Sequence, residues 1–173
     1  GTGPFFEQVS SHTESSEEPI QTDENRQYRS YIQKLRQQFL HSDTEQTPVD
    51  ITLNSQPIQV NRLNGGKTEN IYRGNIREIS YQNGTIIRIF PNGYQKVLFT
   101  NGDVKESFSS GKVVYYYYSA DTTHTEYPNK LQIFKFPNGQ MERHYPDPDG
   151  TKEIHFPDHS TKFMHARFGS MYE

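Results

Sequence analysis

From about residue 70 onward, the chain repeats short segments of mixed polar and apolar residues, each followed by an aromatic residue and a turn sequence. The glycines at 84, 93, 102 and 111 stand nine residues apart, and three of them follow Asn. Asn-Gly is a strong hairpin signal, and turns this close leave strands of about six or seven residues. The spacing predicts an antiparallel meander, because it leaves no room for crossover connections. The turn units are Tyr81–Gly84, Phe90–Gly93, Phe99–Gly102, Phe108–Gly111, Tyr127–Lys130, Phe136–Gly139, Tyr145–Gly150 and Phe156–His159.

The odd spacing of these turns predicts which side chains share a face. If each Asn-Gly is the centre of a two-residue type I′ loop, facing residues on neighbouring strands have opposite parity. Because side chains alternate faces along a strand, every strand would present its turn aromatic on the same face. That face is expected to carry Tyr81, Phe90, Phe99, Phe108 and Tyr117, with Val97, Val104, Glu106 and Tyr115 between them.

Neither face of the expected sheet is apolar enough to form the interior of a β-sandwich. We therefore expect a mainly β fold, a free-standing single-layer antiparallel meander sheet of about nine or ten strands, with an N-terminal helix. Backbone hydrogen bonds and cross-strand pairs would hold it, with both faces largely solvated. Closure into a barrel is an alternative that the pattern allows, whereas antiparallel hairpins disfavour a β-helix.

Composition divides the chain into four regions. Residues 1–23 are rich in Ser, Glu and Thr and are expected to be a disordered lead-in. Residues 24–41 are expected to form an amphipathic helix. It either packs against its own domain, forms the tail of a coiled coil, or binds a partner. Residues 42–69 are polar and are expected to be a linker with at most one strand, at 51–60, before the sheet domain of residues 70–168. The apolar face of the helix is made of Tyr28, Tyr31, Ile32, Leu35 and Phe39.

Composition also bounds the function. Only 31% of the residues are hydrophobic and the mean hydropathy is −0.96, yet 13% are aromatic, which indicates an ordered backbone with a thin core. The net charge of −3 argues against a nucleic-acid partner. The absence of Cys excludes disulfides and thiolate metal sites. No apolar stretch is long enough to span a membrane and no signal peptide is recognisable, so no membrane partner is expected.

The run Tyr115–Tyr118 is the most unusual string of the chain. It is either strand-forming filler or part of a binding platform, because rigid aromatics are favoured at interfaces. In the expected register, one cross-strand row holds Phe99, Val104 and Tyr117, and the next holds Val97, Glu106 and Tyr115. An aromatic patch of this kind, beside an acid, suits a proline-rich peptide in the polyproline II conformation.

Histidines and carboxylates are frequent, but no spacing among them matches a metal motif or a catalytic grouping. An open sheet also offers no water-excluded pocket in which the pKa of a carboxyl could be tuned for catalysis. We therefore expect no metal, no cofactor and no enzymatic activity. The histidines considered are His124, His144, His155, His159 and His165.

The composite pattern resembles the G-box of the CPAP centriole-assembly family, also called the T-complex-protein C-terminal domain. The tyrosine run, then Thr-His-Thr-Glu-Tyr-Pro at 123–128 and Phe-Pro-Asn-Gly-Gln-Met-Glu-Arg-His at 136–144, carry the resemblance over about residues 70–165. It implies a scaffold module in the cytoplasm, at the centrosome or centriole, that binds a short proline-rich motif of a STIL/Ana-type centriole duplication factor.

The resemblance implies that Phe99 and Tyr115 contact the partner, and it places on Glu142 a residue linked to microcephaly. Together with the register argument, the expected peptide-binding site is Phe99, Tyr115, Tyr117, Glu142, Val104 and Glu106. The alternative function is a self-assembling structural spacer, because open sheet edges are templates for pairing with another chain. Two turns depart from the pattern, since Lys130 and His159 replace the glycine.

Overall fold

The structure, a computed structural model, describes residues 22–40 and 43–173. The expected disordered lead-in, residues 1–23, therefore lies almost wholly outside the described residues. The chain forms two compact units, the first ending at Leu40 and the second made of the rest of the chain. Each unit is described by itself.

The first unit contains helix α2, Asp23–Phe39, close to the expected range of 24–41. Thr22 caps its N-terminus, because the Thr22 hydroxyl accepts a hydrogen bond from the Asn25 amide at 3.2 Å. The helix is amphipathic, as the sequence predicted, and it is neither long nor apolar enough to cross a membrane. Its buried side chains are Tyr28, Ile32 and Leu35.

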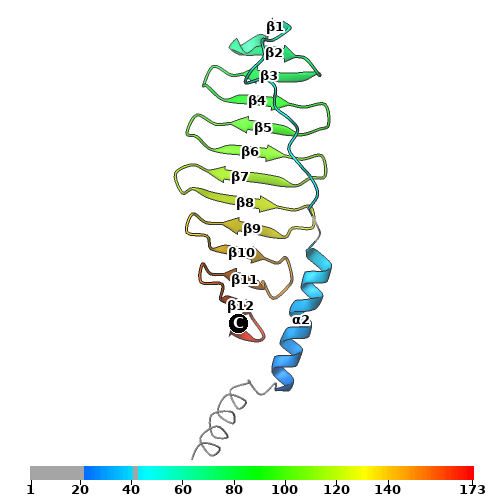
Figure 1. Cartoon of the computed structure of the whole chain (residues 1–173), viewed down its shortest axis with the longest axis vertical. Helices are drawn as coiled ribbons and strands as arrows, with labels where there is room; N and C mark the ends of the chain where they lie inside the picture. Colours follow the sequence, from blue (N-terminus) through cyan, green and yellow to red (C-terminus); the bar gives the residue numbers. More distant parts are fainter. Residues whose placement is uncertain (1–21, 41–42) are drawn as a thin grey trace, which may run out of the picture. The chain divides into compact units, whose positions relative to one another are not determined.

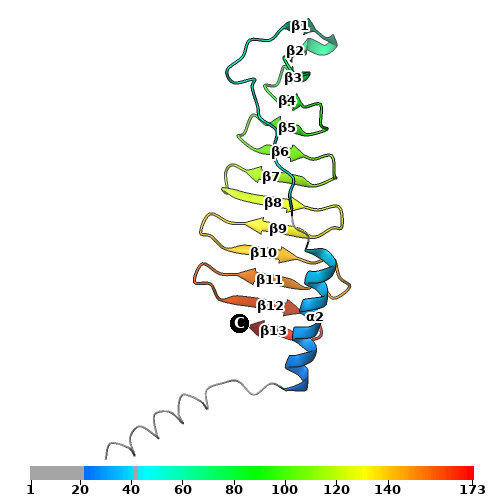
Figure 2. The ribbon, with the colours of Figure 1, turned by 45° about the vertical axis from the view of Figure 1, so that its right-hand side comes forward.

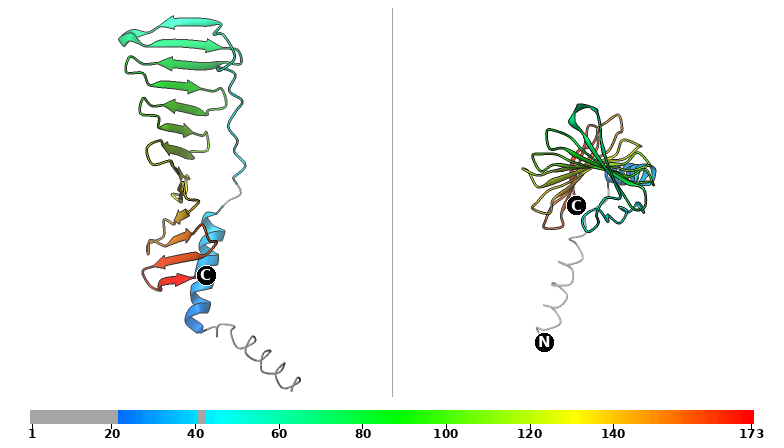
Figure 3. Two further views of the ribbon diagram at one scale, coloured as in Figure 1. Left: turned by 60° about the vertical axis from the view of Figure 1, so that its left-hand side comes forward. Right: turned by 90° about the horizontal axis from the view of Figure 1, so that it is seen from above.

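The second unit is a single open antiparallel sheet of thirteen strands, in which each strand pairs with the next along the chain (Figure 1). The expected fold class is confirmed, but the expected number of strands was too low, because every strand has only four or five residues. The right-handed twist accumulates from strand to strand, so the strands fan out when seen from above (Figure 3). The strands are β1 Gln59–Arg62, β2 Thr68–Tyr72, β3 Ile76–Ser80, β4 Ile86–Ile89, β5 Gln95–Leu98, β6 Val104–Ser107, β7 Val113–Tyr117, β8 Thr122–Glu126, β9 Gln132–Lys135, β10 Met141–His144, β11 Lys152–His155, β12 Thr161–His165 and β13 Gly169–Tyr172, with a short 3-10 helix η1, Asn64–Gly66, between the first two.

The sheet extends beyond the expected range of residues 70–168 at both ends, since β1, the first two residues of β2 and β13 lie outside that range. The strand expected at 51–60 starts only at Gln59, because a turn in which the Asn54 amide donates to the Ile51 carbonyl comes first. Neither the β1–β2 nor the β2–β3 connection contains an aromatic-x-Asn-Gly unit, so the repeat could not reveal these strands.

The turns that contain an aromatic-x-Asn-Gly unit are three-residue loops, not the expected two-residue type I′ loops. In the turn after β4, the Phe90 amide donates to the Tyr94 carbonyl at 2.9 Å, and the Gly93 amide donates to the Phe90 carbonyl at 3.1 Å. Gly93 adopts a φ of +89°, whereas Asn92 keeps a negative φ and its side chain accepts the Tyr94 amide at 3.0 Å. Pro91 suits this geometry, because the second position of a type I turn needs a φ near that of proline.

The extra loop residue shifts the register of the sheet by one. Across these three-residue turns, facing residues have equal parity, as in the pair Leu98 and Val104. Turn aromatics therefore alternate between the two faces, and the prediction that they share one face was wrong. Phe90 and Phe108 lie on one face and contact Tyr94, whereas Tyr81 and Phe99 lie on the other.

Residues 43–58, within the expected linker, form an extended strap that runs across successive strands (Figures 1 and 2). Its Asp43 pairs with Lys112 Nζ at 2.8 Å, and its Asp50 pairs with Arg88 Nη1 at 3.2 Å. We call the covered side the strap face and the other side the Tyr115 face. The polar composition of residues 43–58 suggested a linker. It could not reveal the strap, because the partners of these residues are charged groups on strands far along the chain.

Under the strap lies a small core, so the expectation that both faces are largely solvated holds less well for the strap face. Tyr72, Ile76, Phe90 and Tyr94 are at most 6% exposed. Ile51 of the strap and Phe108 pack against this cluster. The register explains the core, because it brings alternate turn aromatics to one face, where the strap excludes water from them.

We expect Gly102→Ala to destabilise the sheet more than Gly139→Ala. Both glycines have a φ near +90°, so both variants carry the strain of a left-handed residue, about 1–2 kcal/mol. A Cβ at Gly102 would lie 2.7 Å from Tyr118 Cγ, whereas a Cβ at Gly139 would meet nothing within 4 Å. Urea unfolding should show an additional loss of about 1 kcal/mol for Gly102→Ala. Equal losses would contradict the close approach.

Candidate functional site

Three aromatic rings gather on the Tyr115 face of the sheet. Phe99, in the turn after β5, stacks on Tyr115 of β7 with ring centroids 5.9 Å apart. Tyr115 in turn contacts Tyr117 at 4.4 Å, and Tyr117 remains 40% exposed. The rings are held by the sheet yet accessible from solvent, as an aromatic binding surface requires.

The rings continue across the neighbouring strands. Tyr115 faces His124 on β8, and His124 faces Phe134 on β9. The His124 and Phe134 rings are nearly parallel, with centroids 4.4 Å apart, and His144 lies 4.7 Å from Phe134. We call this set, together with Phe136, the aromatic row: Phe99, Tyr115, Tyr117, His124, Phe134, Phe136 and His144.

Asp103 anchors the tyrosines at one end of the aromatic row. Its Oδ1 accepts the Tyr118 amide at 2.9 Å, and its Oδ2 accepts the Tyr115 hydroxyl at 2.8 Å. These hydrogen bonds, that from the Tyr118 amide first, hold the pKa of the Asp103 carboxyl below its usual value. The hydrogen bond from the Tyr115 hydroxyl to Asp103 raises the pKa of that hydroxyl, which therefore stays protonated as a donor. Asp103 thus orients the Tyr115 ring.

Comparison with known proteins shows what this sheet is similar to. The T-complex protein 10 C-terminus family matches residues 75–107 and 128–158. Centrosomal P4.1-associated protein (CPAP) of Mus musculus is 45% identical over 81 residues, which are 46% of this chain and 6% of that protein. The TCP10 domain of Danio rerio CPAP, solved with a peptide of STIL, is 40% identical with a TM-score of 0.53, covering 61% of this chain and 58% of that chain. The sheet is thus similar to the CPAP G-box.

A second solved G-box extends the comparison. The SAS-4 TCP domain of Drosophila melanogaster, in complex with a proline-rich motif of Ana2, is 29% identical with a TM-score of 0.57. The match covers 78% of this chain and 80% of that chain. The chain spans 6% of the length of the curated relatives it matches, so the comparison concerns the G-box and not the rest of those proteins.

The sheet brings together three of the six residues predicted for the site, Phe99, Tyr115 and Tyr117. Val104 and Glu106 lie on the strap face, and their predicted place beside Phe99 was wrong. Val104 faces Tyr116, and Glu106 accepts a hydrogen bond from the Tyr94 hydroxyl at 2.5 Å. The cause is the register, because each of these turns contains one residue more than predicted. One turn separates β6 from β5, so its residues were assigned to the wrong face. Two turns separate β7 from β5, so the two errors cancel.

Glu142 lies on the Tyr115 face of the sheet but apart from the three rings. It faces Phe134, and three strand steps separate it from Tyr115, about 14 Å. One of its carboxylate oxygens lies 3.0 Å from His144 Nε2, and the other accepts a hydrogen bond from the side-chain Nε2 of Gln140 at 2.9 Å. Glu142 thus fixes the His144 ring against Phe134, at the far end of the aromatic row.

Sequence reasoning missed Asp103 and the continuation of the aromatic row over β8–β10. The signal for Asp103 was its place directly after the turn glycine, where the residue faces the turn aromatic across the hairpin. The signal for His124 and Phe134 was the length of the β7–β8 loop. Four residues, 118–121, separate the facing pair Tyr117 and Thr122, so the residues on the Tyr115 face change from odd to even numbers there.

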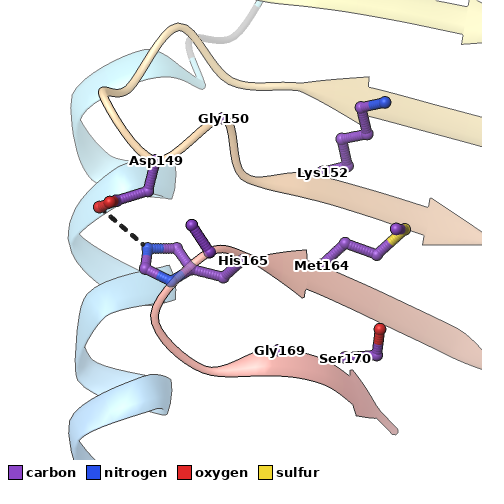
Figure 4. A pocket seen from close by; sticks show the side chains of 8 residues that line it. Asp149, Gly150, Lys152, Met164, His165, Gly169 and Ser170 are labelled. Atoms are coloured by element: carbon purple, nitrogen blue, oxygen red, sulfur yellow. Dashed lines mark ion pairs between the residues drawn. The ribbon is translucent and has the colours of Figure 1, made fainter.

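A cluster formed by the β10–β11 turn and the end of β12 contains three potential metal-ligating side chains, Asp147, Asp149 and His165. His165 Nδ1 accepts the Arg167 amide at 2.9 Å, so a neutral ring carries its proton on Nε2, which lies 3.2 Å from Asp149 (Figure 4). Both oxygens of Asp147 accept hydrogen bonds from Thr151. These bonds give the cluster a structural role at the ends of two hairpins.

We expect Asp103→Asn to lower the free energy of unfolding at pH 7. A carboxylate whose pKa is held below the ordinary 3.8 stabilises the fold above that pH, and this contribution is lost as pH falls through the lowered value. The difference between wild type and Asp103→Asn in urea unfolding should therefore narrow between pH 7 and about pH 3. A difference that does not change with pH would contradict the charged hydrogen bonds.

Proposed function

We propose that this G-box binds a short proline-rich segment of a STIL/Ana2-type centriole duplication protein on the aromatic row. One observation carries the proposal, the stack of Phe99, Tyr115 and Tyr117 on one accessible face. A polyproline II segment docks on such rings because it is already extended and loses little entropy on binding. Relatives solved with a STIL peptide and with a proline-rich motif of Ana2 support the choice of partner.

The proposed contacts are Phe99, Tyr115 and Tyr117, with Glu142 acting through His144. Val104 and Glu106 are left out because they lie on the strap face. The proposed role is binding without catalysis, as a scaffold module in centriole assembly that acts in the cytoplasm at the centrosome or centriole. Similarity to a centrosomal protein supports that location.

We expect Phe99→Ala and Tyr115→Ala each to weaken binding of a proline-rich peptide by about 2 kcal/mol, roughly thirtyfold in Kd. Each change removes a ring from the stack while leaving the strand backbone in place. Isothermal titration calorimetry with the unlabelled peptide would measure the Kd of each variant. Tyr116→Ala is the matched control, because Tyr116 neighbours Tyr115 in sequence but lies on the strap face. Unchanged affinity in both test variants would remove the proposed site.

A second candidate function is self-association through the sheet edges. β1 and β13 each pair with one neighbouring strand in the sheet. Exposed apolar side chains lie beside both edges, with Val60 52% and Tyr172 68% exposed. An unpaired edge with apolar side chains favours strand addition by a second copy. This surface is distinct from the aromatic row, so both functions are compatible.

If the edges pair, the weight-average mass in sedimentation velocity should rise with concentration, and Val60→Lys should lower it. A lysine at an edge strand opposes pairing by its charge. Val49→Lys in the strap is the control, because Val49 is 83% exposed but lies outside every strand. A protein that stays monomeric at millimolar concentration would speak against this second function.

A further inference from the structure

One lysine lies in line with the aromatic row. Lys105 on β6 faces Val97 on one side and Tyr115 on the other, so its neighbours in the strand ladder are apolar or aromatic. Its side chain is half-buried. Lys96, on the strap face, is equally half-buried but faces Glu106. The two lysines thus differ in the charge opposite them.

The ion pairs within the described part of the sheet use other cations: Arg77, Arg88, Lys112 and Arg143. The carboxylate two residues before Lys105 is Asp103, and its oxygens already accept hydrogen bonds from Tyr115, Tyr118 and Asn101. Lys105 therefore brings a positive charge to the aromatic row that none of the described ion pairs neutralises.

We infer that Lys105 selects a partner segment that carries an acidic residue close to its prolines. The inference rests on the proposed function and adds a charge requirement to it. A peptide packed on Tyr115 would cover the neighbouring ammonium group and remove part of its water. A carboxylate on the peptide offsets this loss, whereas a neutral peptide leaves the charge covered and unpaired.

The reach of the acidic residue follows from the sheet. Facing residues lie about 5 Å apart, and a polyproline II segment advances about 3 Å per residue. The acidic residue should therefore lie within about two residues of the proline that contacts Tyr115. A carboxylate suits the site better than a phosphate group, because phosphate sites usually combine several arginines and a single lysine acts as one point charge.

The experiment uses the full chain and a set of proline-rich peptides in which one flanking position after another is Asp or, in the matched peptide, Asn. At one position, the Asp peptide should bind wild type about three- to fivefold more tightly than the Asn peptide at low salt. Lys105→Gln should abolish this ratio, and the control Lys96→Gln should keep it. Thermal unfolding of both variants tests that the fold is intact.

A charge swap tests the contact directly. Lys105→Glu should bind the peptide with Lys at the same position more tightly than the peptide with Asp. An Asp-to-Asn ratio that Lys105→Gln leaves unchanged, at every position, overturns the inference. Binding that depends on Phe99 but not on Lys105 removes this inference alone, whereas a failure of every peptide to bind removes the proposed function as well.

Discussion

A residue with positive φ at the fourth position of each aromatic-x-Asn-Gly turn decides how this sheet is built. In the turns that end on Gly84, Gly93 and Gly102, that residue lets the chain add one residue beyond a two-residue loop. The side-chain oxygen of the preceding Asn then accepts a hydrogen bond from the backbone amide two residues later, as Asn83 and Asn101 do. The register of the whole sheet follows, because side chains alternate between faces with period two.

The register separates stability from recognition. Alternate turn aromatics go to the strap face, where Phe90 and Tyr94 form a core under the strap and ion pairs with Asp43 and Asp50 hold the strap in place. The intervening ones go to the Tyr115 face, where Phe99 stacks on Tyr115. A single-layer sheet can thus present rings to a partner on one face because the other face and the backbone ladder supply its cohesion.

The sequence was sufficient for the fold class, the helix and the antiparallel order, because hydrophobic periodicity and turn residues are local signals. The register was not, because Asn-Gly occurs in loops of two and of three residues. The decisive clue was Pro91, which fits the second position of a type I turn. Phe99 and Tyr115 were nevertheless assigned to the same face correctly, since two turns separate their strands. Val104, only one turn from Phe99, was assigned to the wrong face. The strap could not be predicted, since the partner of Asp43 is Lys112, far along the chain.

The most direct test of this account is the face on which a proline-rich peptide lies. Isotope-filtered NOE spectroscopy of the labelled chain with an unlabelled peptide reports contacts between proline protons and individual rings. The account predicts NOEs to Phe99 and Tyr115, and none to Tyr94 or Phe108. Proline contacts with the Tyr94 or Phe108 rings, on the strap face, would contradict it.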